Sequence, residues 1–240
     1  MKIRANGPRV SMILVSALLA VILFGSLSVE ANEGNINKRG DLVWAGYDGN
    51  DWEIYLYSKG VITQITDNDS DDWDPQINDK GQIVFRGSDG HDPEICLYSK
   101  GTITQITHNE YTDMDPQTNS KGEIVWLGWD GNDWEIYLYS KGVITQITDN
   151  EYQNIQPQIN DKGQIVWRGS DGNDDEIYLY SKGTITQITD NGQTDRLPQV
   201  NSKGQIVWTG YDGNDYEIYL YSKGVITQIT DNDYNDMMYD

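Results

Sequence analysis

One unit of this sequence is repeated five times between Asn35 and the C-terminal end, at a constant spacing of 41 residues. The same slot of each unit holds a large aromatic residue, at Trp44, Phe85, Trp126, Trp167 and Trp208. A unit of this length cannot bury its apolar side chains alone, so it must stack on its copies. Five near-identical units also lack the single differentiated position at which an enzyme usually places its catalytic groups.

Each unit has the pattern of four short strands separated by tight turns. In the first unit, residues 53–57 alternate aliphatic and aromatic side chains, and residues 61–66 form a second strand-like run behind a Ser-Lys-Gly turn. Glycine supplies the positive φ that such hairpin turns require. We expect a proline to begin the innermost strand of units two to five, where a missing N–H is tolerated. These prolines are Pro75, Pro116, Pro157 and Pro198.

Four short antiparallel strands in a repeat of ~40 residues are typical of a β-propeller blade. The sequence therefore predicts an all-β fold, a five-bladed β-propeller of four-stranded antiparallel blades. The predicted blades span approximately residues 34–74, 75–115, 116–156, 157–197 and 198–240. The first unit supplies its own inner strand, so we expect the ring to close without exchanging a strand between its ends. An open five-blade arc and a ring completed by a second chain are the alternatives.

The unit PQINDKGQIVW-RGSDGNDDEIYLYSKGTITQITDN resembles the TolB-type (WD40-like) propeller repeat. The shared features are the proline, the N-D-x-G turn, the I-V-W strand, the D-G turn and the I-Y-x-Y strand that leads to Q-I-T. The resemblance covers all five units, about residues 34–232. It implies a propeller fold but leaves the function open, because such propellers serve as scaffolds, binding modules and enzyme domains alike.

The N-terminal segment has the pattern of an export signal. Three basic side chains lie within the first nine residues, residues 10–27 are almost wholly apolar or small, and Val29-Glu30-Ala31 offers a cleavage site. We predict a signal peptide over residues 1–31 and a mature propeller over residues 32–240, without membrane insertion after cleavage. The product is then periplasmic, at the cell surface or extracellular. An uncleaved membrane anchor is the alternative, since the apolar stretch approaches the ~20 residues that span a bilayer.

The mature chain is strongly acidic. Removing Lys2, Arg4, Arg9 and Glu30 from the 17 basic and 38 acidic residues leaves 14 and 37, a net charge of −23. This charge argues against nucleic acid and anionic lipid as partners, because both need a basic footprint. It favours a soluble monomer and suits cations or neutral polar ligands.

The two faces of the expected ring differ in charge. The turns between the second and third strands and the links between blades emerge on one face, the top face, and the other turns emerge on the bottom face. The top face collects the repeated aspartates of the D-G-N-D turns and the acidic links. The bottom turns hold most of the basic residues of the mature chain: Lys38, Arg39, Lys59, Lys80, Lys100, Lys121, Lys141, Lys162, Lys182, Lys203 and Lys223.

Aromatic residues flank the D-G-N-D turns of units one, three and five, and one further tryptophan lies in a variable link. A flat ring on the top face can stack on the apolar face of a sugar, and Trp and Tyr are enriched at recognition sites. The alternative is cross-strand packing that braces each hairpin. The predicted ligand-binding residues are Tyr47, Trp52, Trp73, Trp129, Trp134, Tyr211 and Tyr216.

The D-G-N-D turns invite a Ca²⁺ interpretation, since hard cations bind several carboxylate and carbonyl oxygens. However, Asp-Gly is a common dipeptide in hairpin turns. The repeat also lacks the D-x-[DN]-x-[DN]-G spacing with a distal Glu that is typical of a calcium-binding loop. We therefore interpret each turn as structural and expect at most weak Ca²⁺ binding, with no other cofactor. Asp67, Asp69 and Asp71 are the best single set of metal ligands.

No catalytic residue is predicted. His91 and His108 are the two histidines, they lie in different units, and neither G-x-S-x-G nor H-E-x-x-H occurs. The sequence favours an exported, non-enzymatic binding module that takes a glycan or protein ligand on an acidic, aromatic-rimmed top face. A polysaccharide-active hydrolase or lyase and an envelope scaffold protein are the alternative functions.

Overall fold

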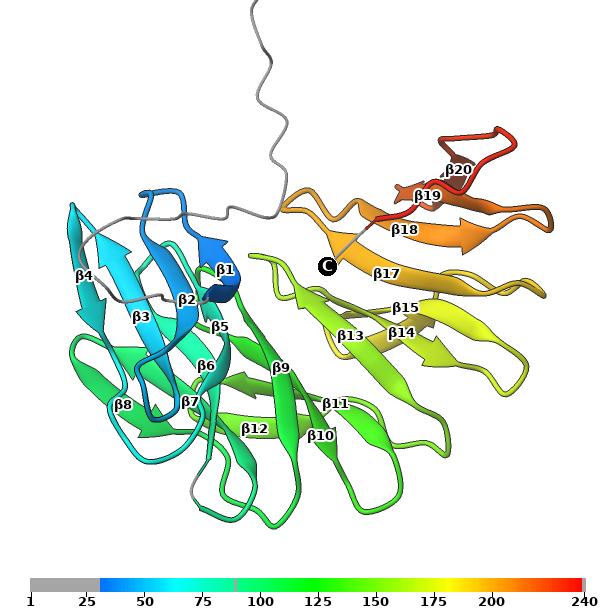
Figure 1. Ribbon diagram of the computed structural model, residues 1–240. Helices are drawn as coiled ribbons and strands as arrows, with labels where there is room; N and C mark the ends of the chain where they lie inside the picture. Colours follow the sequence, from blue (N-terminus) through cyan, green and yellow to red (C-terminus); the bar gives the residue numbers. More distant parts are fainter. Residues whose placement is uncertain (1–30, 89, 239–240) are drawn as a thin grey trace, which may run out of the picture.

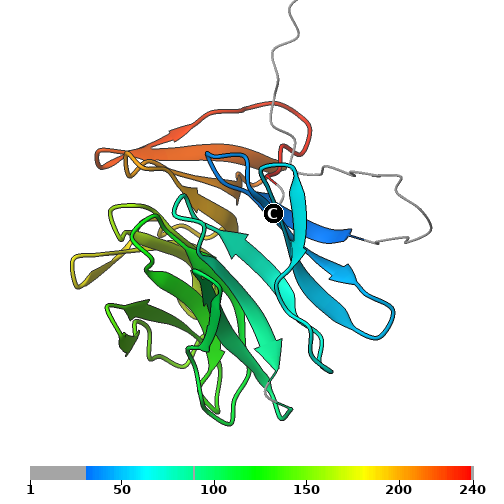
Figure 2. The same ribbon diagram turned by 90° about the vertical axis from the view of Figure 1, so that its left-hand side faces the viewer.

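A computed structural model describes residues 31–88 and 90–238 of the chain. The predicted signal peptide therefore lies outside the described residues, except for its last position, Ala31. All described elements are strands, grouped in five four-stranded antiparallel sheets, which confirms the predicted all-β five-bladed propeller. None of the described segments forms a helix that is long and apolar enough to cross a membrane. Figures 1 and 2 show the five sheets arranged around a common centre.

The strands follow the sequence from the inner to the outer edge of each blade. Blade 1 consists of β1 (Ala31–Ile36), β2 (Leu42–Tyr47), β3 (Trp52–Ser58) and β4 (Val61–Gln64). Blade 2 consists of β5 (Trp73–Ile77), β6 (Ile83–Ser88), β7 (Pro93–Ser99) and β8 (Thr102–Gln105). Blade 3 consists of β9 (Asp113–Thr118), β10 (Ile124–Trp129), β11 (Trp134–Ser140) and β12 (Val143–Gln146).

Blades 4 and 5 repeat the same order. Blade 4 consists of β13 (Asn154–Ile159), β14 (Ile165–Ser170), β15 (Asp175–Ser181) and β16 (Thr184–Gln187). Blade 5 consists of β17 (Asp195–Val200), β18 (Ile206–Tyr211), β19 (Tyr216–Ser222) and β20 (Val225–Gln228).

The inner strands begin earlier than the prolines predict. Strand β5 starts at Trp73, two residues before Pro75, and its pairing with β6 shifts register between Trp73 and Gln76. The residue before the proline, Asp74, has a φ of 55°. The proline therefore lies in a bulge inside the strand and not at its start, which is one of the few strand positions that tolerate a missing N–H.

Neighbouring blades pack through the same pair of faces at four junctions. Between blades 3 and 4, Val125 and Ile136 lie against Ile165 and Trp167, and all four side chains are at most 1% exposed. The equivalent residues pack in the same way between blades 1 and 2, 2 and 3, and 4 and 5. These junctions hold the hydrophobic core, since a four-stranded sheet buries its apolar side chains only against its neighbours.

Among the described residues, the fifth pair of faces is not packed. Val207 and Ile218 of blade 5 and Leu42 and Trp44 of blade 1 are only half-buried, although their equivalents at the other junctions are fully buried. The described residues form no core cluster between these two blades. The expectation that the ring closes was therefore wrong, and this part of the chain forms an open five-bladed propeller.

An asparagine ladder ties the bottom turns of successive blades together. In blade 3, Asn119 Oδ1 accepts the backbone N–H groups of Lys121 and Glu123 at 3.0 and 3.1 Å, and Asn119 Nδ2 donates to the backbone oxygen of Asn160 at 3.0 Å. Equivalent cross-blade bonds run from Asn37 to Asn78, from Asn78 to Asn119 and from Asn160 to Asn201. Each asparagine thus holds its own turn and the next blade with one side chain.

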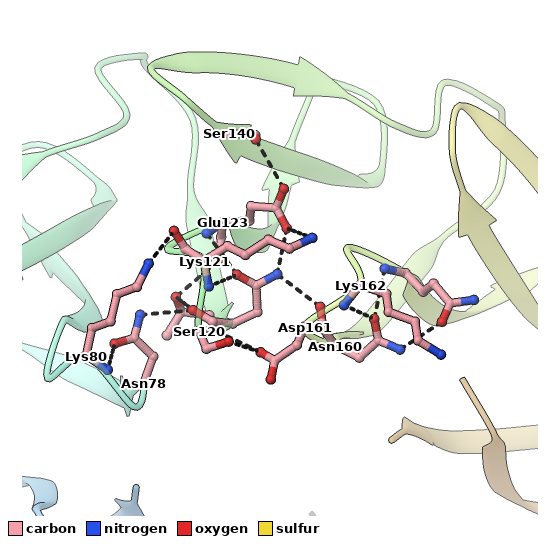
Figure 3. A network of polar contacts seen from close by, with 12 residues as sticks. Asn78, Lys80, Ser120, Lys121, Glu123, Ser140, Asn160, Asp161 and Lys162 are labelled. Carbon is pink, nitrogen blue, oxygen red and sulfur yellow. Dashed lines mark hydrogen bonds and ion pairs between the residues drawn. The ribbon is translucent and has the colours of Figure 1, made fainter. Parts of the chain in front are cut away.

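The ladder stops at blade 5. Asn201 Nδ2 donates to Gln205 Oε1 of its own turn at 3.0 Å, and Asn201 is exposed. A second set of bonds runs beside the ladder, where Ser120 donates through its backbone N–H and its hydroxyl to Asp161 Oδ1, at 2.8 and 2.5 Å (Figure 3). Lys38 contacts Asp79 in the same way at the first junction. In the described part of the chain, the asparagine ladder therefore runs without a gap from blade 1 to blade 5.

Candidate ligand-binding face

The top turns of the blades have the geometry expected of D-G hairpins. In blade 1, Asp48 Oδ1 accepts the N–H of Asn50 at 2.8 Å, and Asp48 N–H donates to the backbone oxygen of Asp51 at 3.1 Å. Gly49 has a φ of 114°, in the region that favours glycine. The turn fixes the positions of both aspartates at the top of the blade.

The link to the next blade is fastened to the start of β3. Glu53 is fully buried, and its Oε1 accepts the N–H of Asn68 at 2.8 Å. Thr66 Oγ1 accepts the N–H of Ile54 at 2.8 Å. The same glutamate–asparagine bond recurs in the other four blades. This bond ties the link to the start of the third strand in every blade.

The turn and the strand start bring three carboxylates together. One ligand oxygen each of Asp48, Asp51 and Glu53 lies within 4.8 Å of the others. This group and its three equivalents form the carboxylate clusters. The equivalents are Asp130, Asp133 and Glu135 in blade 3, Asp171, Glu176 and Asp190 in blade 4, and Asp212, Asp215 and Glu217 in blade 5.

Burial and mutual repulsion disfavour the charged form of these carboxylates. Burial, followed by the charge of Asp48, raises the pKa of Asp51 above its ordinary value. Burial and then Asp130 raise the pKa of Asp133 in the same way. Carboxylates in such surroundings hold protons more tightly unless a cation neutralises them.

In the clusters of blades 1 and 4, the glutamate lies next to a further acidic group. In blade 4, burial raises the pKa of Glu176 to about 7, and the neighbouring Asp195 adds to the effect. In blade 1, burial raises the pKa of Asp72, which contacts Glu53, to about 7. Blade 3 differs, because Asn154 occupies this slot and its Nδ2 donates to Glu135 Oε2 at 2.9 Å. The asparagine satisfies the glutamate without a shared proton.

The predicted ligand-binding aromatic residues form three pairs at the tops of blades 1, 3 and 5. The ring centroids of Tyr47 and Trp52 are 6.0 Å apart, and Trp73 extends this pair with a centroid 4.5 Å from that of Trp52. Tyr47 is 42% exposed. Trp129 pairs with Trp134 in blade 3 at 5.4 Å. Three rings in contact occur only on blade 1 and the start of blade 2 among the described residues.

Blade 5 carries the last predicted pair. Tyr211 and Tyr216 have ring centroids 5.3 Å apart in an edge-on arrangement, and the Arg196 guanidinium carbon lies 3.9 Å from the centroid of Tyr216. The edge-on pairs fit cross-strand packing, because the partners are direct neighbours in the β18–β19 ladder. Arginine over the tyrosine face adds a cation–π contact that occupies one side of the ring.

A hollow lies beside the aromatic cluster of blades 1 and 2. Its volume is about 380 Å³, and its walls include Asp71, Trp73, Arg86 and Pro93. Arg86 Nε contacts Asp74 Oδ2 at 3.1 Å, so the guanidinium group is held in place. The hollow offers an aromatic face, charged groups of both signs and hydroxyl groups, which is the combination that fixes a polar ligand.

The predicted metal ligands Asp67, Asp69 and Asp71 do not form one of the converging groups of the described residues. Asp71 instead accepts the N–H of Trp52 through Oδ1 at 3.0 Å. The prediction rested on the number of acidic residues in one link. It missed the cluster that the D-G turn and the start of β3 form together. The signal for the cluster is D-G-N-D-x-E, which occurs in units one, three, four and five.

The cavity on the bottom of the ring axis is polar and of about 290 Å³. Its walls include Asp79 and Asp161. The bond from Lys38 lowers the pKa of Asp79, and the bond from Ser120 lowers the pKa of Asp161. Both carboxylates are therefore ionised at neutral pH and bonded, which is unlike the paired acid and base of a glycosidase.

No protein-family model matches the sequence, and no curated protein matches it. Solved structures do match the fold, and they are TolB and other WD40-like β-propeller proteins. TolB from Acinetobacter baumannii aligns with a TM-score of 0.54 and 17% identity, over 75% of this chain and 49% of that protein. The chain thus spans about half the length of that TolB. The fold is that of a TolB-type propeller.

Two other similar structures belong to peptidases. A puromycin-hydrolyzing peptidase of Mycobacterium tuberculosis aligns with a TM-score of 0.65 and 8% identity, over 83% of this chain and 38% of that one. The β-propeller domain of the Trilobed protease from Pyrococcus furiosus, described as having an open velcro topology, aligns with a TM-score of 0.54 and 12% identity over 85% of this chain and 82% of that one. At these identities the similarity shows the fold alone.

Proposed function

We propose that the protein is an exported, non-enzymatic β-propeller that binds a glycan or protein ligand through its top face. The observation that supports this most is the contact of Tyr47, Trp52 and Trp73 beside the hollow on blades 1 and 2. Large aromatic side chains on a rigid scaffold are the residues that most often dominate a binding site. The signal-like N-terminus supports export to the periplasm, the cell surface or the extracellular space.

A glycan array probed with the mature protein tests this proposal. We expect binding that the double variant Trp52→Ala with Trp73→Ala abolishes. The matched variant Trp129→Ala with Trp134→Ala removes an aromatic pair from blade 3, where the described residues place no third ring in stacking contact with the pair, and should retain most of the binding. If both double variants bind every detected glycan as well as the parent does, the aromatic-rim proposal is wrong.

A polysaccharide-active enzyme is the second candidate, and the cavity on the bottom of the axis is the observation that favours it. Asp79 and Asp161 line that cavity. Their lowered pKa values suit a charge-stabilising role and not proton donation. Turnover of a polysaccharide above background, abolished by Asp79→Asn, would replace the binding proposal with this one.

A further inference from the structure

We propose that each carboxylate cluster is a Ca²⁺ site, with the aspartates of the D-G turn and the glutamate of the following strand as ligands. The proposal covers blades 1, 3, 4 and 5, where the clusters are described. It is independent of the proposed function, because the ligands are different residues from those around the hollow. It also differs from a diffuse attraction of cations to an acidic face, since it assigns one ion to each of the four clusters.

The geometry of a cluster fits one ion of this size. The three offered oxygens of Asp48, Asp51 and Glu53 lie within 4.8 Å of one another. Calcium binds oxygen at about 2.3–2.6 Å, so two ligands on opposite sides of one ion are roughly 5 Å apart. One ion can therefore contact all three carboxylates without movement of the backbone.

Buried oxygens without a hydrogen-bond partner provide the second observation. Asp51 and Asp133 are each 8% exposed, and Asp215 is 7% exposed. Oδ1 of Asp51, Oδ1 of Asp133 and both carboxylate oxygens of Asp215 are buried and have no partner among the described residues. Leaving a carboxylate unpaired away from water costs several kcal/mol, so native structures rarely do so. The hairpin turn accounts for Asp48, whose Oδ1 accepts a backbone N–H group of the turn. It does not account for the buried oxygens of Asp51, Asp133 and Asp215.

The described part of the chain supplies no cation at these positions. None of the ion pairs among the described residues involves a carboxylate of the four clusters. Most of the lysines lie in the turns at the opposite face of the ring. An external cation is therefore the remaining source of charge neutralisation.

The chemistry of the ligands selects calcium. All three groups are carboxylates, without the histidine or thiolate that zinc prefers. Magnesium demands a smaller octahedral shell and retains several waters, whereas calcium accepts six to eight oxygens in flexible geometry. The carboxylates of the D-G turn and the strand supply part of that shell, and water completes it.

Blade 4 identifies a fourth ligand position. Its cluster contains Asp190, which lies in the link between blades. The equivalent residues of blades 1, 3 and 5 are also aspartates, Asp67, Asp149 and Asp231, whereas blade 2 has His108 in this slot. We assign this link aspartate to the outer side of the site.

Tryptophan-sensitised terbium luminescence tests the proposal on the mature protein. Tb³⁺ occupies oxygen-rich calcium sites, and Trp52 and Trp134 directly follow the ligands Asp51 and Asp133 in the sequence. We expect saturable terbium emission on excitation of tryptophan, and displacement of the emission by millimolar Ca²⁺ but not by equal Mg²⁺. Calcium sites of extracellular modules have dissociation constants of about 10⁻⁴–10⁻³ M.

Two triple variants separate ligands from general charge. Asp51→Asn with Asp133→Asn and Asp215→Asn changes the clusters of blades 1, 3 and 5. Asp69→Asn with Glu151→Gln and Asp233→Asn removes the same charge from exposed positions in the links of the same three blades. We expect the first variant to lose most of the terbium emission and the second to retain it.

Thermal unfolding gives a readout that does not depend on luminescence. We expect 10 mM CaCl₂ to raise the Tm of the parent and of the link variant by on the order of 10 °C. The cluster variant should gain much less, and it should fold without calcium because it carries less repulsion. Equal loss of the calcium effect in both variants, or an equal gain from NaCl at matched ionic strength, would overturn the proposal. Equal displacement of terbium by Mg²⁺ would overturn the assignment to calcium.

Discussion

The two ends of every blade use buried polar groups in opposite ways. At the bottom, Asn119 completes its hydrogen bonds within its own turn and with the next blade. At the top, Asp133 is also buried, and its Oδ1 has no hydrogen-bond partner among the described residues. A satisfied polar group stabilises a fold, whereas an unsatisfied one costs stability and persists where a ligand completes it. The bottom turns thus tie successive blades together, and the unpaired oxygens at the top support the proposal that this face binds a cation.

Breaking the ladder should have the largest effect. Asn119→Ala removes two accepted backbone bonds and the bond to blade 4, so we expect a loss of about 2–4 kcal/mol in the free energy of unfolding. Urea denaturation monitored by tryptophan fluorescence measures it. Asn201→Ala is the matched control, since Asn201 is exposed and makes no bond to a further blade among the described residues. Equal losses for the two variants would contradict a cross-blade role of the ladder.

The acidic pair of blade 4 should respond to pH. Burial raises the pKa of Glu176 to about 7, well above that of a glutamate in the unfolded chain. The folded state then binds more protons than the unfolded state between pH ~4.3 and pH ~7. The free energy of unfolding of the protein therefore falls as the pH rises through that window. Asp195→Asn should raise the free energy of unfolding at pH 8 by about 1–3 kcal/mol and leave it little changed at pH 4. Urea denaturation at both pH values measures the difference.

The reverse exchange sharpens this prediction. Asn154 accepts the Trp167 indole N–H at 2.9 Å, as Asp195 accepts that of Trp208 at 2.8 Å, so the two slots have the same surroundings. Asn154→Asp should destabilise the protein at pH 8 and less at pH 5. If Asp195→Asn and Asn154→Asp shift the free energy of unfolding in the same direction at pH 8, the acidic pairs do not destabilise the folded protein.

A single substitution in a carboxylate cluster should change stability less than Asn119→Ala does. Without calcium, it should raise stability instead of lowering it. Asp133→Asn reduces the repulsion in the blade 3 cluster, so in EDTA we expect the Tm to rise by about 1–3 °C. In 10 mM CaCl₂ the same variant should melt below the parent, because it has lost a ligand. Differential scanning calorimetry under the two conditions checks this change of sign, and a variant that melts below the parent in both would count against the proposed site.

The exposed ion pair between Lys38 and Asp79 should matter least. Lys38 Nζ and Asp79 Oδ2 are 2.6 Å apart, but the Lys38 side chain is 80% exposed. Solvent and salt screen such pairs. Lys38→Ala should therefore change the Tm by less than about 1 °C, and a larger drop in a melting curve would show that the bottom face depends on charge more than on the ladder.

The sequence predicts the blades well, because the 41-residue spacing and the strand patterns are local properties of each unit. The constant aromatic slot, for example, identifies Trp126 and Trp167 as core residues, and both are 1% exposed. The predicted start of the inner strand was wrong because the bulge that contains Pro75 depends on the pairing with the next strand. Closure of the ring was wrong because the angle between blades follows from packing that no single unit specifies.

The candidate sites were harder to predict for the same reason. Asp51 and Glu53 are separated by one residue, and their convergence with Asp48 requires the turn geometry as well as the strand. Trp52 and Trp73 contact each other across two blades. The aromatic residues themselves could be selected from the sequence, because they flank the repeated turn, but their grouping on blades 1 and 2 could not. Whether they bind a ligand stays a prediction.

A crystal structure with terbium, using its anomalous scattering, tests the contrast between the two faces most directly. The account predicts anomalous peaks between the carboxylates of the clusters, next to Asp51, Asp133, Asp190 and Asp215, and none along the asparagine ladder. Peaks scattered over exposed link aspartates such as Asp69, with the clusters empty at saturating terbium, would contradict it.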